Sequence, residues 1–215
     1  MRRLLALAPA LGLALTPAAA AQTPLPPDAV ATVGETVISK ATYDRWRKVP
    51  RSSMTETMQF LIQAEWVRGE SREWGIRVSR EAVRRAFRRQ RDEAFESRRE
   101  YRRFLRRTHQ THGQMLFRVE QDLLARRLTR RVAATAAPVT RQDVRRFIRN
   151  HPRALRELTR AQRRRKARRT LTAIHQQRAV TRFISEFRPR WRALTVCAEG
   201  YVIAECSNGP PLPPA

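Results

Sequence analysis

Two cysteines, Cys197 and Cys206, are the residues in this sequence whose type and spacing imply chemistry most directly. They enclose the stretch AEGYVIAE, and the chain contains no other cysteine with which either could pair. A redox-active pair normally has the spacing CxxC, and a structural zinc site needs about four ligands. A structural disulfide is therefore the expected chemistry. On the chain-entropy model, closing so short a loop stabilises a fold by roughly 2–3 kcal/mol.

The four histidines, His109, His112, His151 and His175, form no recognisable metal-binding or catalytic pattern. His109 and His112 lie on either side of Thr111, which we expect to cap a helix. His151 precedes a proline at the end of an expected helix, where a surface or capping role is expected. The sequence contains no GxSxG, Walker, HExxH or CxxC motif. We therefore expect a protein that is not an enzyme, with no catalytic residues, no metal ligands and no cofactor.

The N-terminal stretch MRRLLALAPALGLALTPAAAAQ has a basic start, an apolar run and a series of alanines, as secretory signal peptides do. We expect cleavage between Ala21 and Gln22, so that residues 1–21 are the signal peptide. The apolar run is shorter than the roughly 20 residues that span a bilayer. No later stretch is long enough, so we expect no transmembrane segment in the mature chain. An exported protein, whether extracellular, periplasmic or envelope-associated, would favour an oxidised cysteine pair and makes nucleic acid an unlikely partner.

Charge is the most unusual feature of the composition, because the formal net charge is +26 and arginine supplies almost all of the basic residues. The stretch RAQRRRKARRTL, residues 160–171, concentrates this charge. Since arginine pairs recur along much of the chain, we interpret this stretch as a solvated helix face. So large a surplus of positive charge still attracts polyanions. We expect solvated ion pairs with arginine at the acidic positions on helices, which include Glu56, Glu65, Glu70, Glu73, Asp92 and Glu93.

Hydrophobic periodicity predicts a mainly α-helical protein in which short β-strands from both ends of the mature chain pair. Residues 29–39 are typical of two strands around a turn at Gly34. The stretch 196–206 is strand-like, with a turn at Glu199-Gly200. We expect the strand around Tyr201–Ile203 to pair near the 30–38 hairpin and so to join the two ends of the mature chain.

Helix starts are predicted at side chains that can accept hydrogen bonds from the first turn, namely Ser39, Ser53 or Ser52, Ser79, Thr111 and Thr140. Gly75 is a plausible C-terminal cap. A long helix is predicted over 154–187, and Pro189 should end or kink it. The domain organisation expected is a proline-rich disordered segment at 22–28, one helical domain over 29–206, and a flexible tail at 207–215.

The order of these pieces resembles the SurA/PrsA-type extracytoplasmic chaperones, specifically their peptide-binding helical domain. VATVGETVISKATYDRW is similar to the opening hairpin and first helix of that domain. Two later segments are similar to the next helices of that domain. They are LIQAEWVRGESREWGIRVSREAVRRAF and FLRRTHQTHGQMLFRVEQDLLARRL. PVTRQDVRRFIRNH resembles the helix that follows. The stretch QQRAVTRFISEFRPRWRALTVCAEGYVIAECSNGP resembles the C-terminal helix and disulfide tail of actinobacterial members.

The chain departs from this family in one important place. Full-length relatives carry a parvulin-type prolyl isomerase domain of about 100 residues between the FIRNH segment and the C-terminal helix. Only about 20 residues stand there in this sequence, near 152–170, and no glycine occurs from residue 114 to residue 199. A glycine-rich isomerase sheet is not expected from such a segment.

The resemblance implies a chaperone-like module that holds unfolded or nascent secreted polypeptides without ATP. The candidate groove residues are Trp46, Phe60, Trp66, Trp74 and Phe87, although aromatic stripes also form cores. A second hypothesis is a polyanion-binding envelope protein that acts on anionic polymers, phospholipid or nucleic acid through its arginine-rich surface. A third is a residual prolyl isomerase.

Overall fold

The computed structural model describes residues 25–49 and 52–213 of the chain. Its elements are β1 (Ala29–Val33), β2 (Thr36–Ser39), α1 (Lys40–Arg47), α2 (Met54–Glu73), α3 (Arg80–Ala94), α4 (Arg98–Arg107), α5 (His112–Ala133), α6 (Arg141–Asn150), α7 (Arg160–Ala193) and β3 (Thr195–Cys197). The mainly helical fold with a small sheet is therefore confirmed. The predicted signal peptide and its cleavage between Ala21 and Gln22 lie outside the described residues.

The sheet joins the two ends of the described chain, in the strand order β2-β1-β3 with both pairings antiparallel. Ala31 lies opposite Cys197, and Val33 lies opposite Thr195. The pairing strand is thus β3, and the expectation that residues 201–203 pair with the hairpin was wrong. The turn that ends at Gly200, where φ is +79°, carries the chain away from β1 before those residues are reached.

The residues 201–203 nevertheless pack under the hairpin. Ile203 is buried in the same hydrophobic core as β1. The ring of Tyr201 contacts Tyr43 of α1 edge-on, with the ring centroids 5.0 Å apart. This segment therefore joins the two ends through side-chain burial, while β3 does so through backbone hydrogen bonds.

The predicted helix starts are confirmed by side-chain hydrogen bonds from the backbone N–H three residues further on, at Ser39, Ser53, Ser79, Thr111 and Thr140. Gly75 adopts a positive φ of +65° after α2, as the predicted cap requires. Each accepted hydrogen bond satisfies one backbone donor that the helix geometry leaves without a partner. Most helix boundaries could therefore be predicted from the local sequence.

The long C-terminal helix is shifted from its predicted range of 154–187. A 3-10 turn occupies Arg153–Leu155, and α7 begins only after Thr159, whose side chain forms a capping box with Gln162. At its other end α7 continues through Pro189 to Ala193. An internal proline removes one hydrogen bond and costs about 3 kcal/mol. Burial of Trp191, which lies just after the proline and near the end of the helix, offsets this cost.

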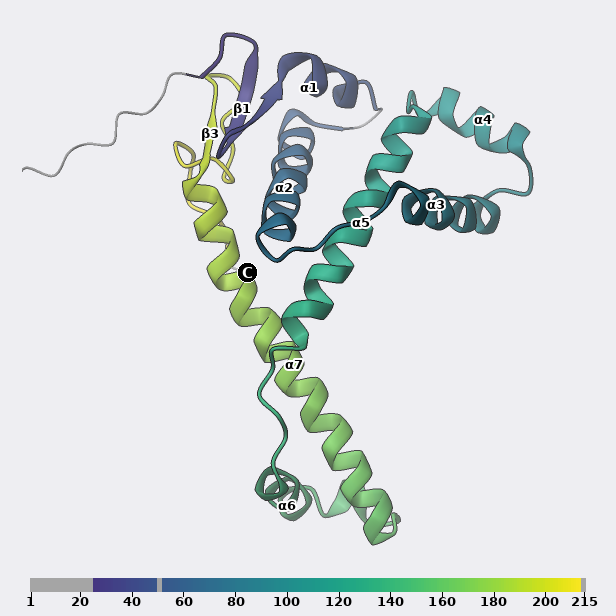
Figure 1. Ribbon diagram of the computed structural model, residues 1–215, viewed down its shortest axis with the longest axis vertical. Helices are drawn as coiled ribbons and strands as arrows, with labels where there is room; N and C mark the ends of the chain where they lie inside the picture. Colours follow the sequence, from purple (N-terminus) through teal and green to yellow (C-terminus); the bar gives the residue numbers. More distant parts are fainter. Residues whose placement is uncertain (1–24, 50–51, 214–215) are drawn as a thin grey trace, which may run out of the picture.

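Two hydrophobic cores organise the molecule (Figure 1). The first lies between the sheet, α1, α2 and the C-terminal end of α7, and includes Met58, Ile62 and Trp66. The second lies between α3, α4 and α5, and includes Phe87 and Tyr101. Figure 1 shows that the C-terminal end of α5 meets the middle of α7, and that α6 lies beside the far end of α7, away from the sheet. Among the described helices, none is both long and apolar enough to cross a bilayer.

The predicted disulfide is present between Cys197 and Cys206, with a Cα–Cα distance of 5.7 Å. Residues just after it make specific contacts. The Ser207 N–H donates to the carbonyl of Thr195 at 2.7 Å, and the Asn208 side chain donates to the carbonyl of Cys197 at 2.9 Å. The start of the expected tail at 207–215 is thus hydrogen-bonded to β3.

Candidate functional site

A hollow of about 530 Å³ opens between β2, α1, α2 and the N-terminal end of α5. We name it the aromatic hollow. Its apolar lining comes from Val37, Ile38, Trp46, Leu61 and Phe117. Charged side chains that also line it are Arg45, Lys48, Glu65 and Arg68. An apolar surface bordered by a few polar groups is typical of ligand-binding hollows.

The capping residues of α5 hold one wall of the aromatic hollow in place. Thr111 accepts a hydrogen bond from the backbone of Gln114, and the Gln114 side chain accepts one from the backbone of Thr111. The same Gln114 amide donates to the carbonyl of Arg45 at 3.1 Å. The helix start that the sequence predicts therefore also docks α5 against α1.

An aromatic cluster forms one wall of the aromatic hollow. The ring centroid of Trp46 lies 4.7 Å from that of Phe60 and 5.5 Å from that of Phe117. The guanidinium of Arg118 lies over both Trp46 and Phe60, at 5.0 and 4.7 Å from the ring centroids. Burial against these rings lowers the pKa of Arg118 from its usual value. Cation–π contacts of this kind stabilise the cluster.

Several contacts hold the Arg68 side chain against the wall of the aromatic hollow. Its guanidinium lies 4.5 Å from the centroid of Phe117 and pairs with Glu65 at 3.0 Å and with Glu120 at 2.9 Å. In the described part of the chain, Arg45 and Lys48 form no ion pair. These two cations, rather than Arg68, are available to an acidic ligand.

A second hollow, of about 420 Å³, lies where the C-terminal end of α5 meets the middle of α7. Trp74, Val132 and Phe183 are among its apolar residues, and Arg178 and Arg182 line its edge. The Trp74 and Phe183 rings meet edge-on with centroids 6.0 Å apart. This hollow is separate from the aromatic hollow, because the two share no lining residue.

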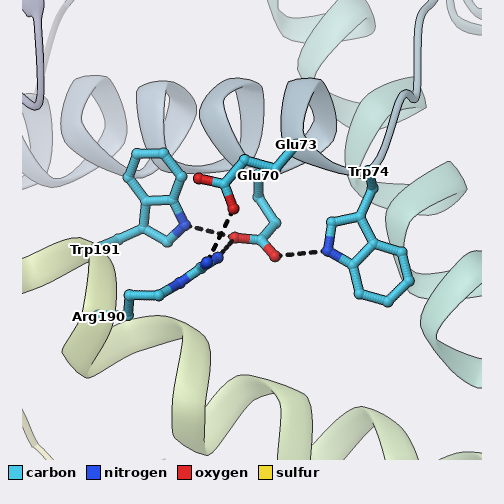
Figure 2. Close-up of polar contacts among 5 residues, drawn as sticks. All are labelled: Glu70, Glu73, Trp74, Arg190 and Trp191. Atoms are coloured by element: carbon cyan, nitrogen blue, oxygen red, sulfur yellow. Dashed lines mark hydrogen bonds and ion pairs between the residues drawn. The ribbon is translucent and has the colours of Figure 1, made fainter.

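The position of Trp74 is set by a buried carboxylate. Figure 2 shows Glu70 of α2 between two tryptophans: Trp74 Nε1 donates to it at 2.8 Å and Trp191 Nε1 at 2.6 Å. Arg190 pairs with Glu70 and also with Glu73, the latter at 2.9 Å. The Glu70 side chain is only 2% exposed. The expectation of a solvated ion pair at Glu70 was therefore wrong, because two indole donors and one guanidinium compensate its burial.

The structure does not gather the five candidate groove residues in one place. Trp46 and Phe60 lie together, and Trp74 lies at the second hollow. Trp66 is 1% exposed, and its Nε1 donates to the Thr195 hydroxyl at 2.8 Å. Phe87 is 5% exposed within the core of α3, α4 and α5. Trp66 and Phe87 are thus core residues, since each packs on an opposing helix or strand.

Four of the five apolar residues that line the aromatic hollow, Val37, Ile38, Leu61 and Phe117, were not among the sequence candidates. Val37 is 47% exposed on β2, which is unusual for a large apolar side chain. Alternation along the strand could have indicated this, because its neighbour Ile38 is buried. Phe117 gave no such signal, since it lies beside the apolar stripe of α5 and meets Trp46 only through tertiary packing.

Two of the histidines, His112 and His151, contact aromatic side chains. The Tyr101 hydroxyl lies 3.0 Å from His112 Nδ1, and the His151 ring stacks on Phe147. Burial raises the pKa of Tyr101. Within residues 25–49 and 52–213, no group of three or more His, Cys, Asp or Glu side chains is placed to hold a metal ion.

No protein-family model, curated protein or solved structure matches this chain significantly.

Proposed function

We propose that this protein binds extended or unfolded polypeptide segments in the aromatic hollow, as a chaperone-like module of the SurA/PrsA type. The observation that carries the proposal is an apolar hollow whose mouth displays a half-exposed Val37 and two cations, Arg45 and Lys48. The order of sequence segments and the mainly helical fold with strands from both ends also support the family resemblance.

The proposed mechanism is weak, reversible burial of client side chains. Complete burial of one large apolar side chain is worth about 1.5–3 kcal/mol, and association entropy opposes it. Each contact with the hollow is therefore weak, and a client is held through several such contacts and released quickly. The proposal includes no ATP and no covalent step.

The charged mouth adds a preference among clients. Arg45 and Lys48 would attract acidic residues that flank an apolar segment. Because such exposed charges act across a Debye length of about 8 Å at physiological ionic strength, this preference should weaken as salt increases.

We also propose that the mature protein acts outside the cytoplasm. The disulfide between Cys197 and Cys206 supports this location, since such bonds persist in oxidising compartments. The short connection between α6 and α7, which contains no glycine, supports a form of the family fold without the isomerase domain.

Suppression of client aggregation tests the proposed function. Light scattering of a reduced or heated client should fall as the protein is added, and a protease-coupled assay should detect no prolyl isomerisation. The variant Val37→Asn removes the apolar side chain at the hollow and should weaken suppression about fivefold, because roughly 1 kcal/mol of apolar burial is lost.

Leu194→Asn is the matched control, because Leu194 has the same 47% exposure as Val37 but does not line the hollow. It should suppress aggregation as the wild type does. Absence of suppression by the wild-type protein at every stoichiometry would refute the chaperone proposal. Equal loss in both variants would refute the assignment to the aromatic hollow, and clear isomerase turnover would refute the non-enzymatic mechanism.

A further inference from the structure

Positive charge is distributed very unevenly over the structure. Residues 25–76, which form the sheet, α1 and α2, contain seven basic and seven acidic side chains and are formally neutral. Residues 141–169 contain 13 basic and two acidic side chains, a formal net charge of +11. We name this segment the arginine tip. Residues 77–140 also carry a net charge of +11, from 18 basic and seven acidic side chains, but spread it over more than twice the length. The arginine tip is therefore the part of the chain with the densest positive charge.

The arginine tip is an ordered structure at one end of the molecule. It comprises α6, the 3-10 turn and the first part of α7, which Figure 1 shows at the end farthest from the sheet. Val144, Leu155 and Ala167 are buried between these elements. The backbone positions that carry the basic side chains are consequently held in a fixed arrangement.

Few of these cations are neutralised within the protein. In the described chain, the arginine tip forms one ion pair, between Arg156 and Glu157 at 3.8 Å, and both side chains are more than 80% exposed. Arg163 instead donates to the carbonyls of Leu158 and Arg156, each at 2.8 Å. Arg164, Arg165, Arg168 and Arg169 are exposed and lie at helical-neighbour spacings on α7.

We propose that the arginine tip binds a water-soluble, linear polymer of phosphate groups that carries no bases. Guanidinium groups bind phosphate with two parallel hydrogen bonds, which lysine cannot do. Twelve of the 13 basic residues of the tip are arginine. From Arg160 to Arg169 the helix rises about 14 Å at 1.5 Å per residue, so one extended polymer can contact several guanidinium groups at once.

The apolar composition of the tip argues against a membrane as the partner. The large hydrophobic side chains that are exposed in the described chain are Val37, Ile184 and Leu194, and none of them belongs to the tip. A helix that lies in a membrane interface needs an apolar face to bury. The charge of the tip is thus suited to a polymer in solution.

The aromatic composition of the tip argues against single-stranded nucleic acid. Such strands bind through aromatic side chains on which bases stack. Phe147 is the aromatic residue of the tip that could stack, and its ring already lies 4.1 Å from that of His151. A polymer without bases does not need aromatic side chains for stacking, so their absence does not weaken its binding.

Binding of labelled long-chain inorganic polyphosphate to the full chain tests this proposal by fluorescence anisotropy over a range of salt concentrations. In the quadruple variant R164Q/R165Q/R168Q/R169Q, affinity at 0.15 M salt (a concentration at which the Debye length is about 8 Å) should fall more than tenfold. The slope of log K against log salt should decrease by about three, since each phosphate contact contributes about 0.7–0.9. The variant should keep the circular dichroism spectrum of the wild type, because all four residues are exposed.

The matched control R88Q/R89Q/R102Q/R103Q removes four exposed arginines from α3 and α4. It should change polyphosphate affinity by less than threefold. The charge-preserving variant R164K/R165K/R168K/R169K should keep the salt slope but bind several-fold more weakly. Equal loss in the tip and control variants would overturn the proposal, as would unchanged binding in the tip variant. Tighter binding of anionic vesicles or of a single-stranded oligonucleotide than of polyphosphate would also overturn it.

Discussion

The indole Nε1 of Trp191 donates a hydrogen bond of 2.6 Å to the buried carboxylate of Glu70, and this bond joins the C-terminal end of α7 to the middle of the fold (Figure 2). The two residues are 121 positions apart in sequence. Glu70 also accepts from Trp74, which lines the second hollow. One carboxylate therefore holds α2 against α7 and sets the wall of a surface hollow.

Replacement of Glu70 should be strongly destabilising. Glu70→Ala leaves the buried indole N–H of Trp191 and the half-buried one of Trp74 without an acceptor, so the free energy of unfolding should fall by about 2–4 kcal/mol. Urea denaturation measures this change. Glu73→Ala is the control, because Glu73 pairs with the same Arg190 but is 49% exposed, and its loss should cost less than about 1 kcal/mol. Similar costs for the two variants would contradict the role assigned to Glu70.

Gly69 should not tolerate a side chain. A Cβ at this position would overlap the six-membered ring of Trp191. Gly69→Ala should therefore destabilise by about 1–3 kcal/mol, although alanine is otherwise the better helix former by about 1 kcal/mol. Gly113→Ala tests the opposite case, since only the Thr111 hydroxyl comes near, at 3.8 Å, and it should raise the melting temperature slightly. A stabilising Gly69→Ala would show that α2 and α7 are not in close contact.

Loss of the disulfide should lower stability by about 2–3 kcal/mol on the chain-entropy model. The double variant Cys197→Ala/Cys206→Ala should show this decrease in urea denaturation. The wild-type protein should lose the same amount in reducing buffer, while the double variant should be unaffected by the reductant. If the wild type is insensitive to reductant, the bridge does not contribute to the stability of the β3 segment.

The cap of α6 should titrate at low pH. Hydrogen bonds from the Thr140 hydroxyl and backbone hold the pKa of Asp143 below its usual value of 3.8. A lowered pKa in the folded state means that this contribution to stability is complete above about pH 4 and is lost as pH falls through the folded-state pKa. NMR titration of the Asp143 carboxyl should show the lowered pKa in the wild type, and Thr140→Val should return it towards 3.8. An unshifted wild-type pKa would contradict the cap.

Local sequence determined most of the helix boundaries, because capping is a short-range interaction. Ser53 and Glu56 form their capping box three residues apart, and Thr140 and Asp143 do the same. The two cysteines also determined their own pairing, since neither had another partner. The start of α7 was misplaced because a 3-10 turn and a helix have similar apolar spacing over a few residues.

Only the tertiary structure decided which aromatic side chains form a surface and which form a core. Trp66 and Trp46 are both buried in the first core, but Thr195 covers the indole of Trp66, whereas one side of Trp46 also lines the aromatic hollow. The same holds for charge: Glu70 was expected in solvent and is buried between two tryptophans from different helices. The arginine tip could be counted in the sequence, but its separation from the neutral sheet region needed the fold. Periodicity shows that a helix has an apolar face, whereas contacts between residues more than 100 positions apart decide what covers that face.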